Sequence, residues 1–210
     1  MRNARTRALP EATFYGRRIE PPPYVPHGMS QVMEPGSKAP EFRLPNANPN
    51  SGSESMSLAE AMGENGLIVA FTCNHCPYVV GSEPRIEAIA EKSRSNGIGF
   101  VGINSNDPVM YESDSWDNMV KRASKGMTYP YLHDSTQEAA TSYGAERTPE
   151  FYLIGTDTNI VYRGRLDDSP RDPSHAKTSE LSDAIDDHIS GAKVRIPRTD
   201  SIGCSVKWKA

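Results

Sequence analysis

Two of the three cysteines, Cys73 and Cys76, are separated by two residues in the stretch FTCNHCPYVV. Two sulfurs at this spacing can alternate between a dithiol and a disulfide, because one thiolate attacks a partner's disulfide and the other resolves the mixed disulfide. The same pair could instead supply two ligands to a metal ion. It could also be a pair of buried small side chains. The surrounding elements help to choose between these interpretations.

The cysteine pair follows a continuous apolar run, LIVAF at 67–71, which predicts a strand buried on both faces of a sheet. A helical pattern over 77–93 comes next, with Pro84 as the expected kink. Cys73 should therefore lie at the carboxyl end of a strand, where open α/β sheets place their sites. Cys76 should begin a helix, whose N-terminus stabilises a thiolate. This context favours redox chemistry.

The rest of the chain predicts an α/β domain. The pattern indicates further strands at 97–105, 128–135, 150–155 and 159–165, with helices around 116–123, from Ser135 to Tyr143, and at 181–189. Ser135 and Glu138 fit a capping box, and Gly126, Gly144 and Gly191 fit helix ends. Alternating strands and helices followed by a hairpin predict a mixed central β-sheet with helices on both faces.

The chain of 210 residues divides into an irregular N-terminal arm (1–35), one packed domain (36–192) and a C-terminal tail (193–210) that packs on the domain. The net charge of -4 argues against nucleic-acid and anionic-membrane partners. Five arginines in the first thirty residues, without an apolar core, resemble a solvated tail more than a secretory signal. We therefore expect a cytoplasmic protein.

Several motifs resemble those of one superfamily: GSKAPEFRLPN at 36–46, CNHCPYV, YPYLHDS, RTPEFYLIG, YRGRLDD and the closing GCSVKWK. They occur in the expected order over 36–210. The chain resembles the thioredoxin-like superfamily, and more closely the peroxiredoxin-like branch of the alkyl hydroperoxide reductase/thiol-specific antioxidant (redoxin) family. The resemblance implies a thioredoxin-like fold.

The resemblance also implies roles for particular residues. Thr148 and Pro149 match the cis-proline loop that faces the CxxC and shapes the docking groove, and Arg147 matches an arginine that lowers a thiol pKa. The thioredoxin pattern makes Cys73 the attacking thiol and Cys76 the resolving one, and we expect Cys73 to be the more exposed sulfur. The peroxiredoxin pattern P-x-x-x-T-x-x-C instead places the attacking cysteine at Cys76.

The departures from both patterns leave alternatives open. In the peroxiredoxin alignment, Cys73 replaces the threonine and Val69 the proline. In the thioredoxin alignment, Thr72 replaces the tryptophan before the motif, where it would face substrate. His75 either lowers a thiol pKa or faces solvent. Cys204 is either an auxiliary resolving thiol or a buried cysteine.

We therefore expect a thiol–disulfide oxidoreductase that uses Cys73 and Cys76. Thiol peroxidase activity, Cu(I) binding by the cysteines with His75 or His133, and a non-catalytic binding module are the alternatives. The partner would be a protein or small-molecule disulfide or thiol, and the chain a monomer or homodimer. No Gly-rich phosphate loop indicates an organic cofactor. The aspartate pairs at 167–168 and 186–187 should lie on solvated faces, without acid–base roles.

Overall fold

The computed structural model describes residues 13–14, 17–18 and 32–210. Most of the predicted irregular arm (1–35) therefore lies outside the described residues. Inside it, β1 (Thr13–Phe14) pairs antiparallel with β2 (Arg17–Arg18). None of the helices in the described part is long and apolar enough to cross a membrane.

The predicted mixed central sheet is confirmed. Its five strands are ordered β10-β9-β5-β6-β7. The strands β5, β6 and β7 lie side by side and run parallel, whereas β9 and β10 add the expected antiparallel hairpin. Their bounds are β5 (Gly66–Phe71), β6 (Ile98–Asn104), β7 (Tyr131–His133), β9 (Glu150–Ile154) and β10 (Ile160–Gly164).

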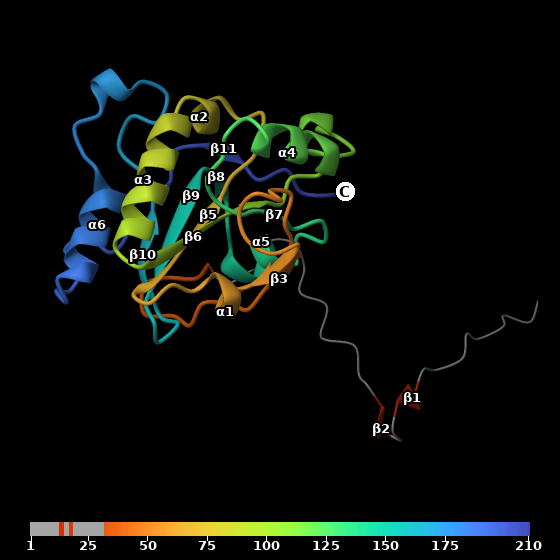
Figure 1. Cartoon of the computed structure of the whole chain (residues 1–210), viewed down its shortest axis with the longest axis horizontal. Helices are drawn as coiled ribbons and strands as arrows, with labels where there is room; N and C mark the ends of the chain where they lie inside the picture. Colours follow the sequence, from red (N-terminus) through yellow and green to blue (C-terminus); the bar gives the residue numbers. More distant parts are fainter. Residues whose placement is uncertain (1–12, 15–16, 19–31) are drawn as a thin grey trace, which may run out of the picture.

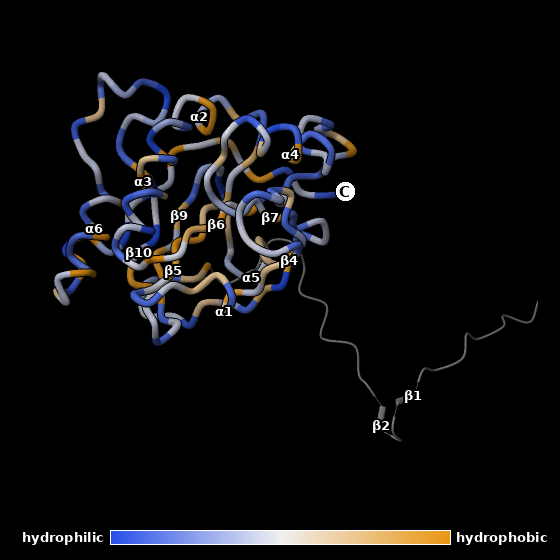
Figure 2. Tube along the Cα trace, viewed as in Figure 1, coloured by the Kyte–Doolittle hydropathy of each residue, from blue (hydrophilic) through white to orange (hydrophobic). Residues whose placement is uncertain are grey.

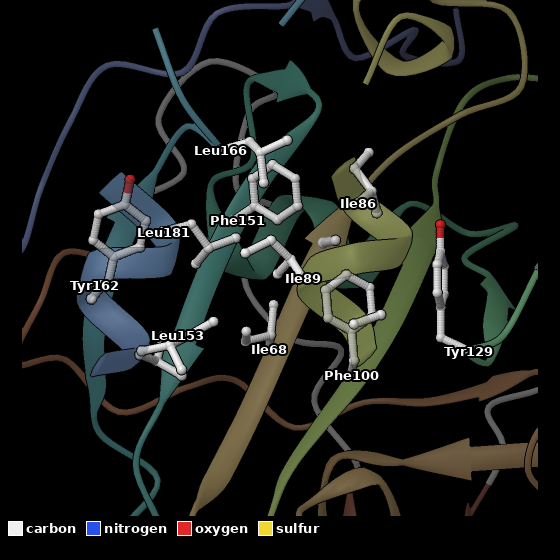
Figure 3. Close-up of a cluster of buried hydrophobic side chains, with 14 of the residues drawn as sticks. Ile68, Ile86, Ile89, Phe100, Tyr129, Phe151, Leu153, Tyr162, Leu166 and Leu181 are labelled. Carbon is white, nitrogen blue, oxygen red and sulfur yellow. The ribbon is translucent and has the colours of Figure 1, made fainter. Parts of the chain in front are cut away.

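Helices cover both faces of this sheet, as Figure 1 shows. On one face, α3 (Glu83–Ser95) and α6 (Glu180–Ile189) bury the side chains drawn in Figure 3, among them Ile89 and Leu181 against Ile68. On the other face, α1 (Leu58–Ala61) and α5 (Glu138–Tyr143) pack on the alternate side chains of the strands. The central strands are accordingly the most apolar part of the trace in Figure 2.

Smaller elements complete the fold. The hairpin of β3 (Arg43–Pro45) and β4 (Ser55–Ser57) precedes the first central strand, and α4 (Trp116–Ala123) packs near β7. A further two-stranded sheet is formed by β8 (Arg147–Thr148) and β11 (Cys204–Ser205), which pair with each other. The short helices are α2 (Pro77–Val80), η1 (Glu112–Asp114) and η2 (Pro173–His175).

Two predicted helix boundaries were wrong. The helix expected over 77–93 is two helices, because the chain turns at Gly81 and Ser82, and Pro84 occupies the first turn of α3 instead of kinking a longer helix. The capping box at Ser135 and Glu138 is absent, since α5 begins after Gln137. The Asp134 carboxylate accepts hydrogen bonds from two backbone N–H groups of this first turn instead.

Candidate active site

The two cysteines of the CxxC lie where β5 ends and α2 begins. Cys76 is the N-cap residue of α2, and Pro77 occupies its first position. Both cysteines are completely buried, at 0% exposure. The expectation that Cys73 is the more exposed sulfur was therefore wrong. The reason is that both side chains belong to a buried cluster formed with residues of other elements.

The loop before β9 supplies the surface that faces both sulfurs. The Thr148–Pro149 peptide bond is cis, and Thr148 is buried. The Cys73 Sγ lies 3.4 Å from the Thr148 hydroxyl oxygen, and the Cys76 thiol donates to the Thr148 carbonyl oxygen over 3.1 Å. Thr148 thus contacts both cysteines from 75 and 72 residues further along the chain, which gives Thr148 and Pro149 a place in the site.

The two sulfurs have strongly different pKa values because they share a proton. A hydrogen bond from the Cys73 thiol lowers the pKa of Cys76 to about 4 against the opposing effect of burial, and Cys204 and the Val79 N–H act in the same direction. The same bond to Cys76 raises the pKa of Cys73, and burial and the Asp114 carboxylate raise it further. The Thr148 carbonyl favours the protonated form of Cys76, but the donors around this sulfur outnumber that single acceptor. The directions of these pKa shifts favour Cys76 over Cys73 as the sulfur that ionises first.

A buried carboxylate that sequence reasoning missed lies beside the turn. Asp114 is completely buried and accepts from the Asn74 N–H over 2.6 Å and from the Asn106 amide over 2.9 Å. It also contacts the His75 Nδ1 over 2.6 Å. The His75 ring stacks on Tyr111, with the centroids 4.8 Å apart. His75 is therefore held against the site by Asp114 and is not simply directed into solvent.

The cation beside the cysteine turn is Arg122, a residue of α4, and not Arg147. Its guanidinium donates to the Cys73 carbonyl oxygen and pairs with Glu83 over 2.8 Å. The Arg147 side chain is exposed, and its charge acts on Cys204, whose pKa it lowers. The thiol pKa that Arg147 lowers is thus that of Cys204, and its action on the CxxC stays a prediction from the resemblance. No local motif marks Arg122, because only the packing of α4 brings it to residue 73.

The Thr148 loop is anchored by Glu150, a second buried carboxylate. Its Oε2 accepts from the backbone N–H groups of Glu146 and Arg147 over 2.9 and 3.0 Å. Its Oε1 pairs with Arg163 over 2.7 Å, and both side chains are almost fully buried. One carboxylate therefore fixes the strand β8 next to the sulfurs.

Cys204 is the third sulfur of the site. It lies on β11, directly opposite Thr148 in the strand pair, and is partly exposed. It packs against the buried cluster that contains Cys73 and Cys76, and its thiol and its N–H lower the pKa of Cys76. Burial and the Cys76 charge raise the pKa of Cys204 to about 11. The auxiliary thiol named from the sequence therefore contacts the CxxC directly.

The remaining predicted residues lie outside the contacts of the sulfurs. Thr72 is buried, and its hydroxyl makes no hydrogen bond within the described part of the chain, so it is not exposed toward a substrate. Asp167 is buried and paired with Arg85, which corrects its expected place on a solvated face. Arg85 reaches it from α3, a contact that no local pattern predicts.

One group of side chains could hold a metal ion. Cys73, His75 and Asp114 place their donor atoms within 4.8 Å of one another. His133, the alternative ligand expected from the sequence, does not join this group and contacts Trp116 instead. A thiolate, an imidazole and a carboxylate form a set suited to zinc. Asp114, however, already accepts hydrogen bonds from its neighbours, so an ion would have to displace them.

The family of this chain follows from comparison with known proteins. The model of the Redoxin family matches residues 34–181, which include the CxxC, Thr148 and Pro149. The chain belongs to the Redoxin family. Within this family it is a thioredoxin-like protein with peroxiredoxin-like relatives, and its chemistry is that of a thiol-dependent oxidoreductase or peroxidase.

Relatives and solved structures agree with this assignment. The protein named "Putative peroxiredoxin Rv2521" from Mycobacterium tuberculosis is 31% identical over 127 residues, 57% of this chain and 69% of that protein. An uncharacterized conserved protein from Geobacillus kaustophilus has a similar structure, with a TM-score of 0.78 and 37% identity over 86% of this chain and 95% of that one. The "putative Thiol:disulfide interchange protein DsbE" from Chlorobium tepidum shares the fold, with a TM-score of 0.52 and 19% identity over 63% and 85%.

Proposed function

We propose that this Redoxin-family chain is a thiol–disulfide oxidoreductase in which Cys76 attacks and Cys73 resolves. The observation that carries the proposal is the geometry of the CxxC turn: Cys76 is the N-cap residue of α2, and Thr148 of the cis-proline loop contacts both sulfurs. The interaction between the two thiols lowers the pKa of Cys76 and raises that of Cys73, in agreement with these roles. A thiolate is the nucleophile in disulfide exchange, so the sulfur ionised at neutral pH takes the attacking role. The Thr148 loop faces both sulfurs and presents them to the partner.

The reaction follows from this arrangement. The Cys76 thiolate attacks one sulfur of the partner's disulfide, and the other partner sulfur leaves as a thiolate and takes a proton from solvent. Cys73 then loses its proton and attacks the Cys76 Sγ of the mixed disulfide. The Cys73–Cys76 bond forms, and the second partner thiol is released. The partner gains two electrons and the dithiol loses them, so the balance needs no cofactor.

Resolution requires a base for the Cys73 proton, and the structure offers His75. A ring nitrogen of His75 lies within 4.8 Å of the Cys73 Sγ, and Asp114 holds the imidazole through Nδ1. Nucleophile, base and orienting carboxylate form the arrangement that activates nucleophiles in other enzymes. In this proposal, His75 accepts the proton of Cys73 and returns it to the departing partner thiolate.

A redox titration tests the proposed function. The full chain is equilibrated in glutathione or dithiothreitol buffers, its thiols are alkylated, and its tryptic peptides are mapped. Cys73 and Cys76 lie on one peptide, 44–85, so their disulfide is internal to it. We expect a two-electron step with a potential between about -270 and -120 mV, the range of CxxC oxidoreductases. No Cys73–Cys76 disulfide at any potential would overturn the proposal.

Trapping experiments assign the two roles. With a disulfide-containing protein substrate, Cys73→Ser should accumulate the mixed disulfide on Cys76, because the resolving sulfur is absent. Cys76→Ser should accumulate none. The wild-type chain is the control and should release the partner as its Cys73–Cys76 disulfide forms. Accumulation on Cys73 in the Cys76→Ser variant would reverse the assignment.

Thiol peroxidase activity is the second candidate function, and the peroxiredoxin-like relatives favour it. Alignment with the peroxiredoxin pattern places the attacking cysteine at Cys76, the sulfur whose pKa is low. The exposed Arg147 and the cysteine at position 73 argue against efficient peroxide activation. Stopped-flow oxidation by hydrogen peroxide decides between the two. Oxidation of Cys76 many orders of magnitude faster than that of an ordinary thiolate would identify a peroxidase.

A further inference from the structure

The chain's own C-terminal tail occupies the edge of the cis-proline loop. In Figure 1, β11 lies beside β8, next to the start of α2. The two strands are antiparallel, with Cys204 opposite Thr148 and Ser205 opposite Arg147. The next residue continues the pairing, since the Val206 N–H donates to the Glu146 carbonyl over 3.0 Å. An extended partner peptide would use these same backbone groups of β8 to dock by strand addition.

The register of the tail is fixed on both sides of Cys204. A Cβ on Gly203 would lie 2.2 Å from the Thr148 carbonyl oxygen, so only glycine permits this close approach. Beyond Cys204, Val206 is buried, and the Lys207 carbonyl accepts from the Asp107 N–H over 2.8 Å. The tail is therefore a positioned segment, and its cysteine is directed at one place.

That place is the Cys76 sulfur. Cys76 contacts the Thr148 carbonyl over 3.1 Å, and Thr148 pairs with Cys204 across the strands. Cys204 packs against the buried cluster that contains Cys73 and Cys76. Cys204 is also partly exposed, whereas the two other sulfurs are completely buried. The three thiols thus form a path from the interior to the surface.

We propose that Cys204 is an intramolecular exchange partner of Cys76, placed by the tail where the sulfur of a docked peptide would lie. This inference rests on the proposed function. The Cys204 thiolate attacks the Cys76 Sγ of the Cys73–Cys76 disulfide. The Cys76–Cys204 bond forms, the Cys73–Cys76 bond breaks, and Cys73 leaves as a thiolate that takes up a proton. Exchange of one disulfide for another needs no external oxidant.

The charges around Cys204 favour this step in the oxidised chain. Burial and the Cys76 anion raise the pKa of Cys204, and the part due to Cys76 is lost once Cys76 is in a disulfide. Lys207 and Arg147, which lower the pKa of Cys204, are then opposed by burial alone. The exchange replaces the Cys73–Cys76 disulfide, whose sulfurs are both buried, by a Cys76–Cys204 disulfide, in which a small thiol reaches the Cys204 sulfur. It also frees Cys73. The tail therefore acts as a built-in relay.

Disulfide mapping of the full chain tests the relay. Cys204 lies on tryptic peptide 199–207, so a bond to Cys76 joins two peptides, whereas the Cys73–Cys76 bond stays within 44–85. The Cys73→Ser variant is equilibrated with mixtures of reduced and oxidised glutathione. The matched control adds Cys204→Ser and Ser205→Cys to it, which moves the tail thiol by one residue to the opposite face of the strand. We expect the Cys73→Ser variant to form the linked peptides at glutathione ratios at least tenfold more reducing than the control requires.

The outcomes separate the relay from the proposed function. Equal cross-linking in the variant and its control would overturn the relay, because the strand would not be directing Cys204 to Cys76. The Cys73–Cys76 step of the wild-type chain is measured in parallel. If it persists while the linked peptides fail to form, the relay is wrong and the oxidoreductase assignment stands. If it is absent, the proposed function fails, and the relay that depends on it fails too.

Discussion

Replacement of Glu150 by glutamine tests how the site is held together. Glu150 is 1% exposed and Arg163 4% exposed, and their side chains are 2.7 Å apart. Glutamine keeps an oxygen for the N–H groups of residues 146 and 147 but turns its NH₂ group toward the guanidinium. Removing one partner of a buried ion pair costs about 3–5 kcal/mol. Arg163 retains the half-exposed Glu34 at 3.0 Å, so we expect the lower end of that range.

Urea unfolding of the reduced chain, followed by far-UV circular dichroism, measures this loss. A cost of about 3 kcal/mol corresponds to a fall in Tm of about 6–12 °C in a chain of this size. Glu146→Gln is the matched control, because Glu146 faces the same Arg163 over 3.8 Å and is largely exposed. It should cost less than about 1 kcal/mol.

The same variant reports on the site, because Glu150 fixes the strand that holds Cys204. We expect Glu150→Gln to increase the alkylation rate of Cys204 several-fold under conditions where the chain remains folded. If Glu150→Gln and Glu146→Gln lower the free energy of unfolding by amounts within about 1 kcal/mol of each other, the reasoning is refuted. Burial would then not decide how much an ion pair with Arg163 contributes to stability.

Three further predictions concern the sulfurs and the tail. Because the folded pKa of Cys76 is about 4, the rate of iodoacetamide labelling of Cys76 should change little between pH 8 and 5, whereas the labelling of an ordinary thiol slows about tenfold per pH unit. Cys73→Ser should shift the pH profile of Cys76 labelling to higher pH. An unchanged profile would contradict the shared proton. The depressed pKa of Cys76 contributes stability that is present above pH 9 and lost as the pH falls toward 4, so urea midpoints of wild type and Cys76→Ser should converge at low pH. Gly203→Ala should displace the tail, lower the free energy of unfolding measured in urea by about 1–3 kcal/mol, and speed the labelling of Cys204. Wild-type stability of this variant would show that the tail does not need the close approach of residue 203 to the Thr148 carbonyl.

The sequence alone determined the framework of this protein. The run LIVAF predicted a strand buried on both faces and the hydrophobic period of 181–189 predicted a helix, and β5 and α6 confirm both. These local patterns give the α/β alternation and therefore place the CxxC at the end of β5. The resemblance also identified Thr148 and Pro149, because their motif, RTPEFYLIG, is one continuous stretch of sequence.

Only the tertiary structure decided the chemistry around the sulfurs. Asp114 and Arg122 act on the site through contacts between elements far apart in the chain, and no local period or motif marks such contacts. Burial likewise removed the expected difference in exposure between Cys73 and Cys76, since both are completely buried. The strand pair that directs Cys204 to Cys76 joins residues 148 and 204. A pKa is set by everything that surrounds a group in space, so the choice between Cys73 and Cys76 had to come from the fold.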